Sequence, residues 1–271
     1  MADRIELTID ELRRRPLPDH GDETSKHERG TVLVIGGTEE TPGAVVLAGV
    51  AALRAGAGKL QVATALACAS AVAVALPEAR VIAIDADLDH ELASADAVLV
   101  GPGALDPERA AARARAVIEG VDDAVVVIDT HALAVLGDDA SLLRRTGARA
   151  VLTPNPGELS HLPGEDALSI ADATGAVVAV RGGTTEVAQP GGPVFVDRSG
   201  NPGLGTSGSG DVLVGMLAGF AARGADPLTA TLWATAVHGR AGERCAARIG
   251  PLGYLARELL DEIPGAVTAL V

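Results

Sequence analysis

A single carboxylate, Asp211, stands at the end of the glycine-rich stretch NPGLGTSGSGDVLVG, residues 201–215. Glycine costs backbone entropy and adds no side-chain packing, so five glycines here indicate a main chain that curls tightly or approaches a ligand closely. The apolar run after Asp211 has the length of a helix and ends at Gly224, a suitable C-cap residue. Such a helix presents unpaired N–H groups to an anion, for which phosphate is the obvious candidate. Asp211 could instead cap this helix, since Asp is a preferred N-cap residue.

Two common nucleotide-binding motifs do not fit this loop. Gly203, Gly205 and Gly208 match the dinucleotide fingerprint G-x-G-x-x-G, but no second strand with a ribose-binding acid is predicted after the helix. A P-loop is excluded because the chain has no G-K-[S/T], and Lys59 is followed by Leu60. The remaining interpretation is a glycine-rich anion hole with a carboxylate at its end.

The chemistry of that arrangement is phosphoryl transfer. Backbone N–H groups near Ser209 and Gly210 would stabilise the phosphoryl group that moves. Asp211 would take the proton from a hydroxyl that attacks phosphorus. The sequence therefore predicts a small-molecule phosphotransferase.

Composition limits the partners and the compartment. The net charge of −14 argues against nucleic acid or an anionic membrane surface as partner. The 22 basic residues include only two lysines, Lys26 and Lys59, a bias typical of proteins that work in high salt and also of GC-rich genomes. Cys68 and Cys245 are too few for a disulfide framework, and no signal peptide or bilayer-length apolar run is evident. We expect a cytoplasmic protein.

Short apolar runs rich in β-branched residues alternate with helical segments and predict a mostly parallel sheet with helices on both faces, an α/β fold. The predicted strands are residues 31–37, 59–64, 80–85, 97–103, 124–130, 148–155 and 176–183, followed by a hairpin of residues 186–189 and 193–198. Residues 211 to about 262 are helical in pattern. We expect a polar N-terminal lead-in over residues 1–28 and a single domain over residues 29–271. Many predicted strands end in Gly, Pro, Asp, Thr or Asn, and these residues should line one ligand-binding edge.

Several segments resemble one known family. GSGDVLVGMLAG resembles the G-[S/A]-G-D motif of the ribokinase-like superfamily, and residues 201–224 are similar to the NAD(P)H-hydrate dehydratases within it. The resemblance continues in GGTEETPGAVVLAGVAALRAGAGKLQVAT, VGPGAL, VVVIDTHAL, LTPNPGEL and VAVRGGTTEVA, which together cover most of residues 31–240 in the family's order. It implies a ribokinase-like three-layer sandwich with a mostly parallel central sheet.

The resemblance also implies an activity. These enzymes repair hydrated NADH or NADPH: ADP or ATP phosphorylates the added hydroxyl, and elimination of phosphate restores the double bond. Asp211 would be the general base and contact the substrate, while Gly208, Ser209 and Gly210 form the anion hole. Ala44 and Gly103 would contact the substrate. The segment that resembles the family's adenine-nucleotide loop is Arg181, Gly182, Gly183, Thr184 and Thr185, and Gly210 would also touch the nucleotide.

Three positions depart from the family pattern. Arg181 replaces a lysine and offers a fork of donors instead of a point charge. Asn155 stands where a substrate-contacting His is expected, so that Asn155 and Glu158 reproduce the N-x-x-E pattern of many ribokinase-like kinases around phosphate and Mg²⁺. The same residues could simply form a turn. His131 occupies the place of a second acid, where it could approach the substrate or serve a structural role.

Three functions stay open at this point. The first is the dehydratase, a lyase that uses ADP or ATP with Mg²⁺, to which Glu158 would contribute through water. The second is a kinase of a small hydroxymethylpyrimidine or thiazole alcohol, which would leave a stable phosphorylated product. The third is a nucleotide-binding regulator without turnover, against which the intact Asp211 and glycine loop weigh. No structural metal is predicted.

The resemblance bears on assembly as well. Bifunctional relatives carry an epimerase domain before the dehydratase domain, and about thirty residues before the first predicted strand are too few for one. Epimerisation would then be spontaneous or occur on another chain. Relatives are often homotetramers, so we expect a homo-oligomer.

Overall fold

The computed structural model describes residues 3–21, 24–147 and 149–271. Ten strands form one sheet in the order β1-β10-β9-β8-β7-β6-β5-β2-β3-β4. Neighbouring strands are parallel except around β9 (Thr185–Ala188), which runs antiparallel to both of its neighbours. This arrangement confirms the α/β class and the mostly parallel sheet.

The predicted strands all form, and most are shorter than predicted; the strand over residues 59–64 has the predicted bounds, and β9 begins one residue earlier than predicted. They are β2 (Thr31–Ile35), β3 (Lys59–Thr64), β4 (Ala79–Ala83), β5 (Ala97–Val100), β6 (Val125–Ile128), β7 (Ala150–Leu152) and β8 (Val177–Val180), and then the hairpin of β9 and β10 (Val194–Asp197). Ala148, at the start of one predicted strand, lies outside the described residues. Strands β2, β5, β7 and β8 end early because a glycine or proline follows within two residues and forms the next loop.

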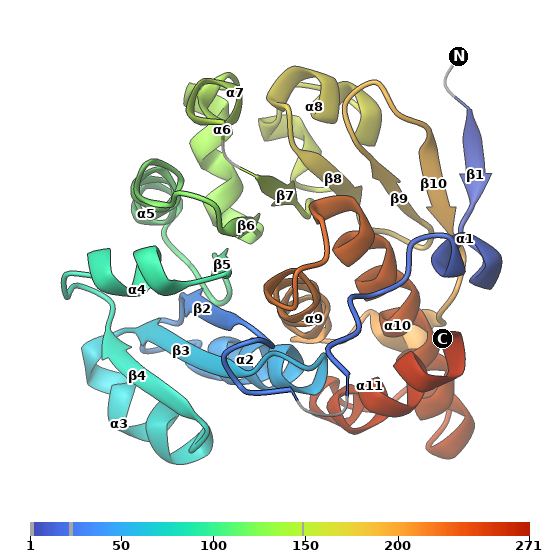
Figure 1. Cartoon of the computed structure of the whole chain (residues 1–271), viewed down its shortest axis with the longest axis horizontal. Coiled ribbons are helices and arrows are strands. Elements are labelled where there is room, and N and C mark those ends of the chain that lie inside the picture. Colours follow the sequence, from blue (N-terminus) through green and yellow to red (C-terminus); the bar gives the residue numbers. More distant parts are fainter. Residues whose placement is uncertain (1–2, 22–23, 148) are drawn as a thin grey trace.

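Alternate residues of each central strand enter different cores, which is why these runs are apolar throughout. Val32 and Val34 of β2 belong to one buried cluster, whereas Leu33 and Ile35 belong to the other. Helices α2 (Gly43–Arg54), α3 (Leu66–Ala75), α9 (Ser209–Ala222), α10 (Pro227–Arg248) and α11 (Ala256–Leu270) contribute to the first cluster. Helices α4 (Asp89–Ser94), α5 (Pro107–Gly120), α6 (Val135–Asp138), α7 (Leu142–Thr146) and α8 (Ala167–Thr174) lie over the other face of the sheet (Figure 1).

The segment before the first predicted strand is more ordered than its polar composition indicates. Residues Arg4–Glu6 form β1, which pairs in parallel with β10 at the edge of the sheet. Helix α1 (Ile9–Arg13) follows, with its N-terminus capped by Thr8. Sequence analysis assigned neither element, because a three-residue strand and a five-residue helix carry too little periodicity to detect.

Two glycines allow α9 and α2 to pack with their backbones in contact. An ideal Cβ on Gly215 would lie 2.2 Å from the carbonyl oxygen of Ala48, and one on Gly219 would lie 2.5 Å from that of Ala52. This close approach brings the N-termini of the two helices together at the carboxyl edge of the sheet. There, a Cβ on Gly208 would lie 2.5 Å from Cδ1 of Leu47.

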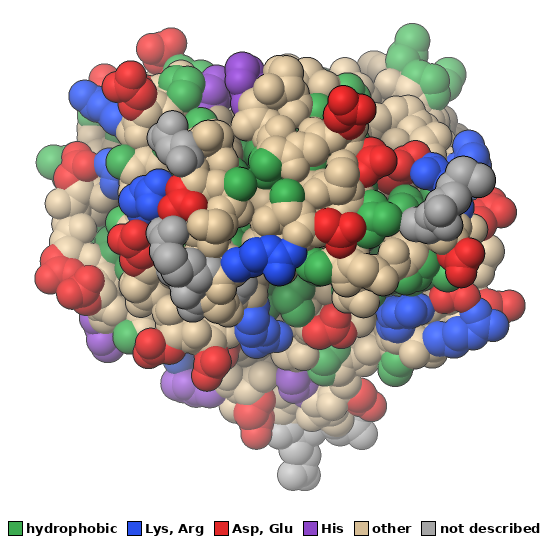
Figure 2. Space-filling model, turned by 90° about the horizontal axis from the view of Figure 1, so that it is seen from above, with side chains coloured by type: hydrophobic (Ala, Val, Ile, Leu, Met, Phe, Trp, Pro, Cys, Tyr) green, Lys and Arg blue, Asp and Glu red, His purple; other side chains and the backbone are tan. Residues whose placement is uncertain are grey.

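Acidic side chains are spread over the face shown in Figure 2, interleaved with arginines. That pattern matches the net charge of −14. Among the described residues, no helix is both long enough and apolar enough to cross a membrane.

Candidate active site

The glycine loop leads directly into the N-terminus of α9. Gly208 is the N-cap, with φ of +87°, and no side chain caps the helix. Glycine suits this position because L side chains rarely adopt a positive φ. The alternative that Asp211 caps the helix is therefore wrong: Asp211 lies within the first turn. Its carboxylate is left for another role.

Asp211 has a carboxyl group whose pKa is raised to about 7. Burial is the main cause, since removal from water disfavours the charged form. The negative charge of Asp129 raises the pKa further, while the guanidinium of Arg181 opposes the shift. A carboxylate with a pKa near neutrality can both accept and release a proton at physiological pH.

Asp129 follows β6 and is nearly fully buried, with 1% of its surface exposed. Its Oδ1 accepts hydrogen bonds from Oγ1 of Thr153 at 2.7 Å and from Nη2 of Arg181 at 2.9 Å. The next residue, Thr130, has φ of 53°, a strained conformation for a β-branched residue. Burial, two donors and this loop geometry hold the Asp129 carboxylate in place.

Arg181 connects this carboxylate to the helix terminus. An ideal Cβ on Gly210 would lie 2.4 Å from Nη1 of Arg181, so the guanidinium rests directly on the backbone of α9. The positive end of the helix dipole and a partly buried guanidinium therefore meet at one point. Together with the N–H groups of the first turn, they form an anion site beside Asp211.

His238 of α10 supports the same turn. Its Nε2 lies 2.9 Å from Oγ and 3.1 Å from the carbonyl oxygen of Ser209. Burial and the nearby Arg181 lower the pKa of His238 to about 4, so the ring is neutral at pH 7. Sequence analysis missed this residue, because it looked only for histidines spaced as metal ligands.

A cavity of about 850 Å³ opens from the anion site toward α10 and the loop after β10. Seven residues predicted from sequence line it: Asn155, Arg181, Gly182, Gly183, Thr185, Ser209 and Gly210. Thr184 and Gly208 are not among its lining residues. The predicted nucleotide loop and the predicted anion hole thus belong to one cavity.

Three buried polar atoms around this cavity have no hydrogen-bond partner: Nε of Arg181, Nδ2 of Asn201 and Oγ1 of Thr235. Buried polar groups are normally paired, so unpaired ones indicate a site for a polar ligand. Asn201 Oδ1 already accepts from the backbone of Gly203 and from the Tyr254 hydroxyl, which leaves the Nδ2 group free to donate. Asn201 and Thr235 were not predicted as site residues: Asn201 opens the quoted glycine loop but was given no role, and Thr235 lies outside every quoted motif.

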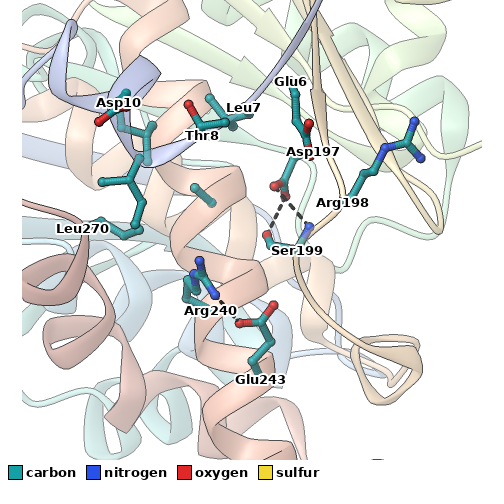
Figure 3. Close-up of a pocket in the computed structure, with 13 residues that line it drawn as sticks. Glu6, Leu7, Thr8, Asp10, Asp197, Arg198, Ser199, Arg240, Glu243 and Leu270 are labelled. Carbon is teal, nitrogen blue, oxygen red and sulfur yellow. Dashed lines mark hydrogen bonds and ion pairs between the residues drawn. The ribbon is translucent and has the colours of Figure 1, made fainter.

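The loop after β10, residues 198–206, forms one wall of the cavity and is fixed by two carboxylates. Asp197 accepts from the hydroxyl of Ser199 at 2.7 Å and from its backbone N–H at 3.2 Å (Figure 3). Glu243 of α10 accepts from the N–H of Gly200 at 3.1 Å. An ideal Cβ on Gly239 would lie 1.9 Å from Ser199 Oγ, so the loop lies flat on α10.

Asp197 also borders a second cavity, of about 520 Å³, between this loop, α10 and the segment around α1 (Figure 3). Burial raises the pKa of Asp197, although its hydrogen bonds from Ser199 oppose the shift. Asp197 therefore lies between the two cavities and lines both of them.

Ala44 and Gly103 lie next to each other. An ideal Cβ on Gly103 would lie 2.9 Å from Cβ of Ala44, and Gly103 has φ of +65°. Thr41 donates from Oγ1 to the carbonyl oxygen of Gly103 at 2.6 Å. The two residues expected to contact substrate are thus neighbours at the α2 N-terminus.

Asn155 and Glu158 form a local turn. Asn155 Oδ1 accepts from the N–H of Gly157 at 2.8 Å, and Glu158 Oε2 accepts from the N–H of Asn155 at 2.9 Å. Among the described residues, no group of three or more His, Cys, Asp or Glu side chains is placed to hold a metal ion. One carboxylate beside the cavity fits a water-mediated contact with a nucleotide-bound Mg²⁺, which typically keeps several waters.

His131, which stands in the place of a second acid, makes a structural contact. Its Nδ1 lies 2.9 Å from the carbonyl oxygen of Ala104. The ring is thereby tied to the loop that follows β5.

A mostly parallel sheet, a glycine-capped helix and an Asp–Arg pair at the helix N-terminus define a ribokinase-like α/β fold. The family model described as NAD(P)H-hydrate dehydratase matches residues 32–265, and the chain belongs to that family.

The chain is similar to several characterised relatives. It is 44% identical to the ADP-dependent (S)-NAD(P)H-hydrate dehydratase of Xanthomonas campestris, over 97% of this chain and 96% of that protein. It is 34% identical to a bifunctional NAD(P)H-hydrate repair enzyme of Moorella thermoacetica, over 93% of this chain but only 52% of that protein. A Bacillus subtilis ADP/ATP-dependent NAD(P)H-hydrate dehydratase, co-crystallised with ATP and Mg²⁺, superposes with a TM-score of 0.85 at 28% identity and covers 98% of this chain and 99% of its own.

Proposed function

We propose that this chain is an ADP-dependent lyase that dehydrates the S form of hydrated NADH or NADPH. The observation that carries the proposal is the place of Asp211: a carboxyl with a pKa of about 7, beside a helix N-terminus covered by Arg181. The family membership and the X. campestris relative give the substrate and the phosphoryl donor.

The reaction begins with phosphorylation of the substrate. Asp211 takes the proton of the hydroxyl on the hydrated ring, and the oxygen attacks the terminal phosphorus of ADP, releasing AMP. The amides of Ser209 and Gly210, together with Arg181, stabilise the charge on the phosphoryl group. Asp129 holds Arg181 in place through their 2.9 Å ion pair.

Elimination completes the reaction. The C–O bond to the new phosphate breaks, a proton leaves the neighbouring ring carbon, and the double bond of NADH is restored. ADP and the hydrated dinucleotide therefore yield AMP, inorganic phosphate and NADH. When bound, Mg²⁺ would neutralise charge on the nucleotide phosphates. Glu158 would hold it through water.

The two ligands approach the anion site from different sides. The nucleotide occupies the cavity of about 850 Å³, where Arg181, Asn201 and Thr235 offer unpaired donors. The hydrated ring lies against Ala44 and Gly103, where the absence of large side chains leaves space beside the backbone. Asn155, at the edge of the cavity, contacts the substrate from the nucleotide side.

The closest competing function is a kinase of a small alcohol, favoured by the N-x-x-E pair of Asn155 and Glu158. Product analysis separates the two functions. With hydrated NADH and ADP, a dehydratase releases free phosphate in a 1:1 ratio with NADH, whereas a kinase accumulates a phosphorylated product. A stable phospho-product without free phosphate would contradict the proposal.

We also propose a cytoplasmic homo-oligomer adapted to high salt. The support is the charge of −14 with only two lysines, since salt screens repulsion between acidic side chains. A melting temperature that rises steeply with KCl supports this adaptation, and a flat response contradicts it. Light scattering during size-exclusion chromatography gives the oligomeric state.

A further inference from the structure

A third cavity, of about 650 Å³, lies over the carboxyl ends of β2, β3, β4 and β5. Two leucines in it are unusually exposed: Leu66 at 75% and Leu105 at 46%. Exposed leucines that face one cavity form an apolar surface suited to a planar ring.

Charged groups surround this apolar surface. Arg113 Nη2 lies 2.6 Å from Asp85 Oδ1, and Arg109 Nε lies 3.5 Å from Asp106 Oδ2. Glu39 and Glu40 add two further carboxylates to the lining. Both arginines thus have acidic partners, and the cavity offers more acceptors than free cationic donors. Such a rim suits sugar hydroxyls better than an additional phosphate.

The cavity lies at the topological switch point of the sheet. From β2 the chain continues to β3 and β4 on one side, and β5 returns to the other side of β2 and leads on to β6. Open α/β sheets bind ligands outside the carboxyl ends of strands at such a point. The end of β2, Gly36 and Gly37, and the end of β5, Gly101, line the cavity.

One of these glycines, Gly101, contacts the loop that carries Asp129. An ideal Cβ on Gly101 would lie 2.1 Å from the carbonyl oxygen of Asp129, and Thr130 Oγ1 donates to the carbonyl oxygen of Gly101 at 2.9 Å. Neighbouring strands lie about 4.8 Å apart, so β2 and β3 lie roughly 10 and 14 Å from β6. That separation is comparable with the distance between the two rings of an extended dinucleotide. The proposed nucleotide cavity lies on the other side of β6, where residues after β7 and β8 line it.

We propose that this third cavity binds the adenosine half of the hydrated dinucleotide, with the base against Leu66 and Leu105 and the ribose hydroxyls toward the carboxylates. The inference rests on the proposed function, because it assumes that the hydrated ring reacts at Asp211. It adds a specificity: a 2′-phosphate would face Asp85, Glu39 and Glu40, so the chain prefers hydrated NADH to hydrated NADPH.

The test compares a whole substrate with a truncated one. The double variant Leu66→Asn with Leu105→Asn changes exposed positions and should fold. We expect its KM for hydrated NADH to rise about tenfold, with the KM for ADP unchanged. Hydrated reduced nicotinamide mononucleotide, which lacks the adenosine half, should be used equally by wild type and variant. The matched control is Val74→Asn, a residue on the same helix as Leu66 that is 83% exposed and lines none of the three cavities.

An unchanged KM for hydrated NADH, or an equal change for both substrates, would overturn the proposal. The Asp85→Asn variant tests the proposed specificity. Its ratio of kcat/KM for hydrated NADH to kcat/KM for hydrated NADPH should be smaller than that of wild type. An unchanged ratio would contradict the proposed preference for hydrated NADH. Binding of ADP-ribose, measured by calorimetry with the nucleotide cavity saturated by a non-hydrolysable ATP analogue, needs no turnover. Binding to wild type but not to the double leucine variant supports the cavity even if the dehydratase proposal fails, whereas equal binding or none refutes it.

Discussion

Arg181 Nη2 lies 2.9 Å from Oδ1 of the buried Asp129, and Nη1 of the same guanidinium rests on the backbone of Gly210. This pair connects the carboxyl end of β6 to the N-terminus of α9 and sets the charge around Asp211. The family's usual lysine would place one cation there, whereas arginine provides one arm for Asp129 and another for a phosphoryl group.

The Arg181→Lys variant should therefore keep the charge but lose one of these two contacts. We expect kcat to fall by about 10- to 100-fold, in line with the loss of one donor to a transition-state oxyanion. Steady-state kinetics and a melting curve check this. A variant as active as wild type would show that the fork geometry is not needed.

Removal of the base should strongly reduce turnover without preventing ADP binding. We expect Asp211→Asn to lower kcat by roughly 10²- to 10⁴-fold, the usual contribution of a general base. Calorimetric titration with ADP should give an affinity similar to that of wild type. Retained activity would remove Asp211 from the catalytic role.

The same substitution should increase stability at high pH. The pKa of Asp211 is raised in the folded protein, so its contribution to stability is greatest at low pH and is lost as pH rises through about 7. The gain in melting temperature of Asp211→Asn over wild type should thus be larger at pH 8 than at pH 5. A gain in melting temperature that is smaller at pH 8 than at pH 5 would contradict a raised pKa for Asp211.

The decrease of kcat/KM at acidic pH should follow the protonation of Asp211. We expect kcat/KM to fall below pH 7 as the base becomes protonated. In Asp129→Asn, the repulsion disappears and Arg181 loses its partner, and both changes lower the pKa of Asp211. The decrease should move to lower pH by roughly one unit. If this decrease stays at the same pH in Asp129→Asn, it reports the titration of a group other than Asp211.

Asp197 should act on nucleotide binding through the loop that it holds. We expect Asp197→Ala to free Ser199 and raise the KM for ADP several-fold, with little change in kcat or in the KM for hydrated NADH. Glu6→Gln is the control, since Glu6 lines the neighbouring 520 Å³ cavity but is not a lining residue of the nucleotide cavity. Equal loss for both substrates would indicate only general destabilisation.

Sequence predicted the fold well because its signals are local. The apolar runs that became β2 to β8 are continuous, and glycines or prolines mark where β2, β5, β7 and β8 stop. Asp211 was found because its glycine loop precedes a long apolar helix. The short β1 was not predicted, since its pairing with β10 depends on contacts across the whole chain.

The contacts of the site that sequence did not predict join segments far apart in the chain. Thr153 and Arg181 converge on Asp129 only after the strands are placed side by side. His238 reaches Ser209 from another helix, and Thr235 reaches the nucleotide cavity from the same helix. The interpretation of Asp211 as a helix cap failed because Gly208, with its positive φ, begins the helix first.

The most direct test mixes the purified protein with hydrated NADH and Mg²⁺ and follows absorbance of the reduced nicotinamide with ADP, ATP or no nucleotide, in low and high KCl. Our account predicts recovery of that absorbance with ADP, none without nucleotide, and a recovery slowed by at least about 100-fold with Asp211→Asn. No recovery under any condition, or equal recovery without nucleotide, would contradict it.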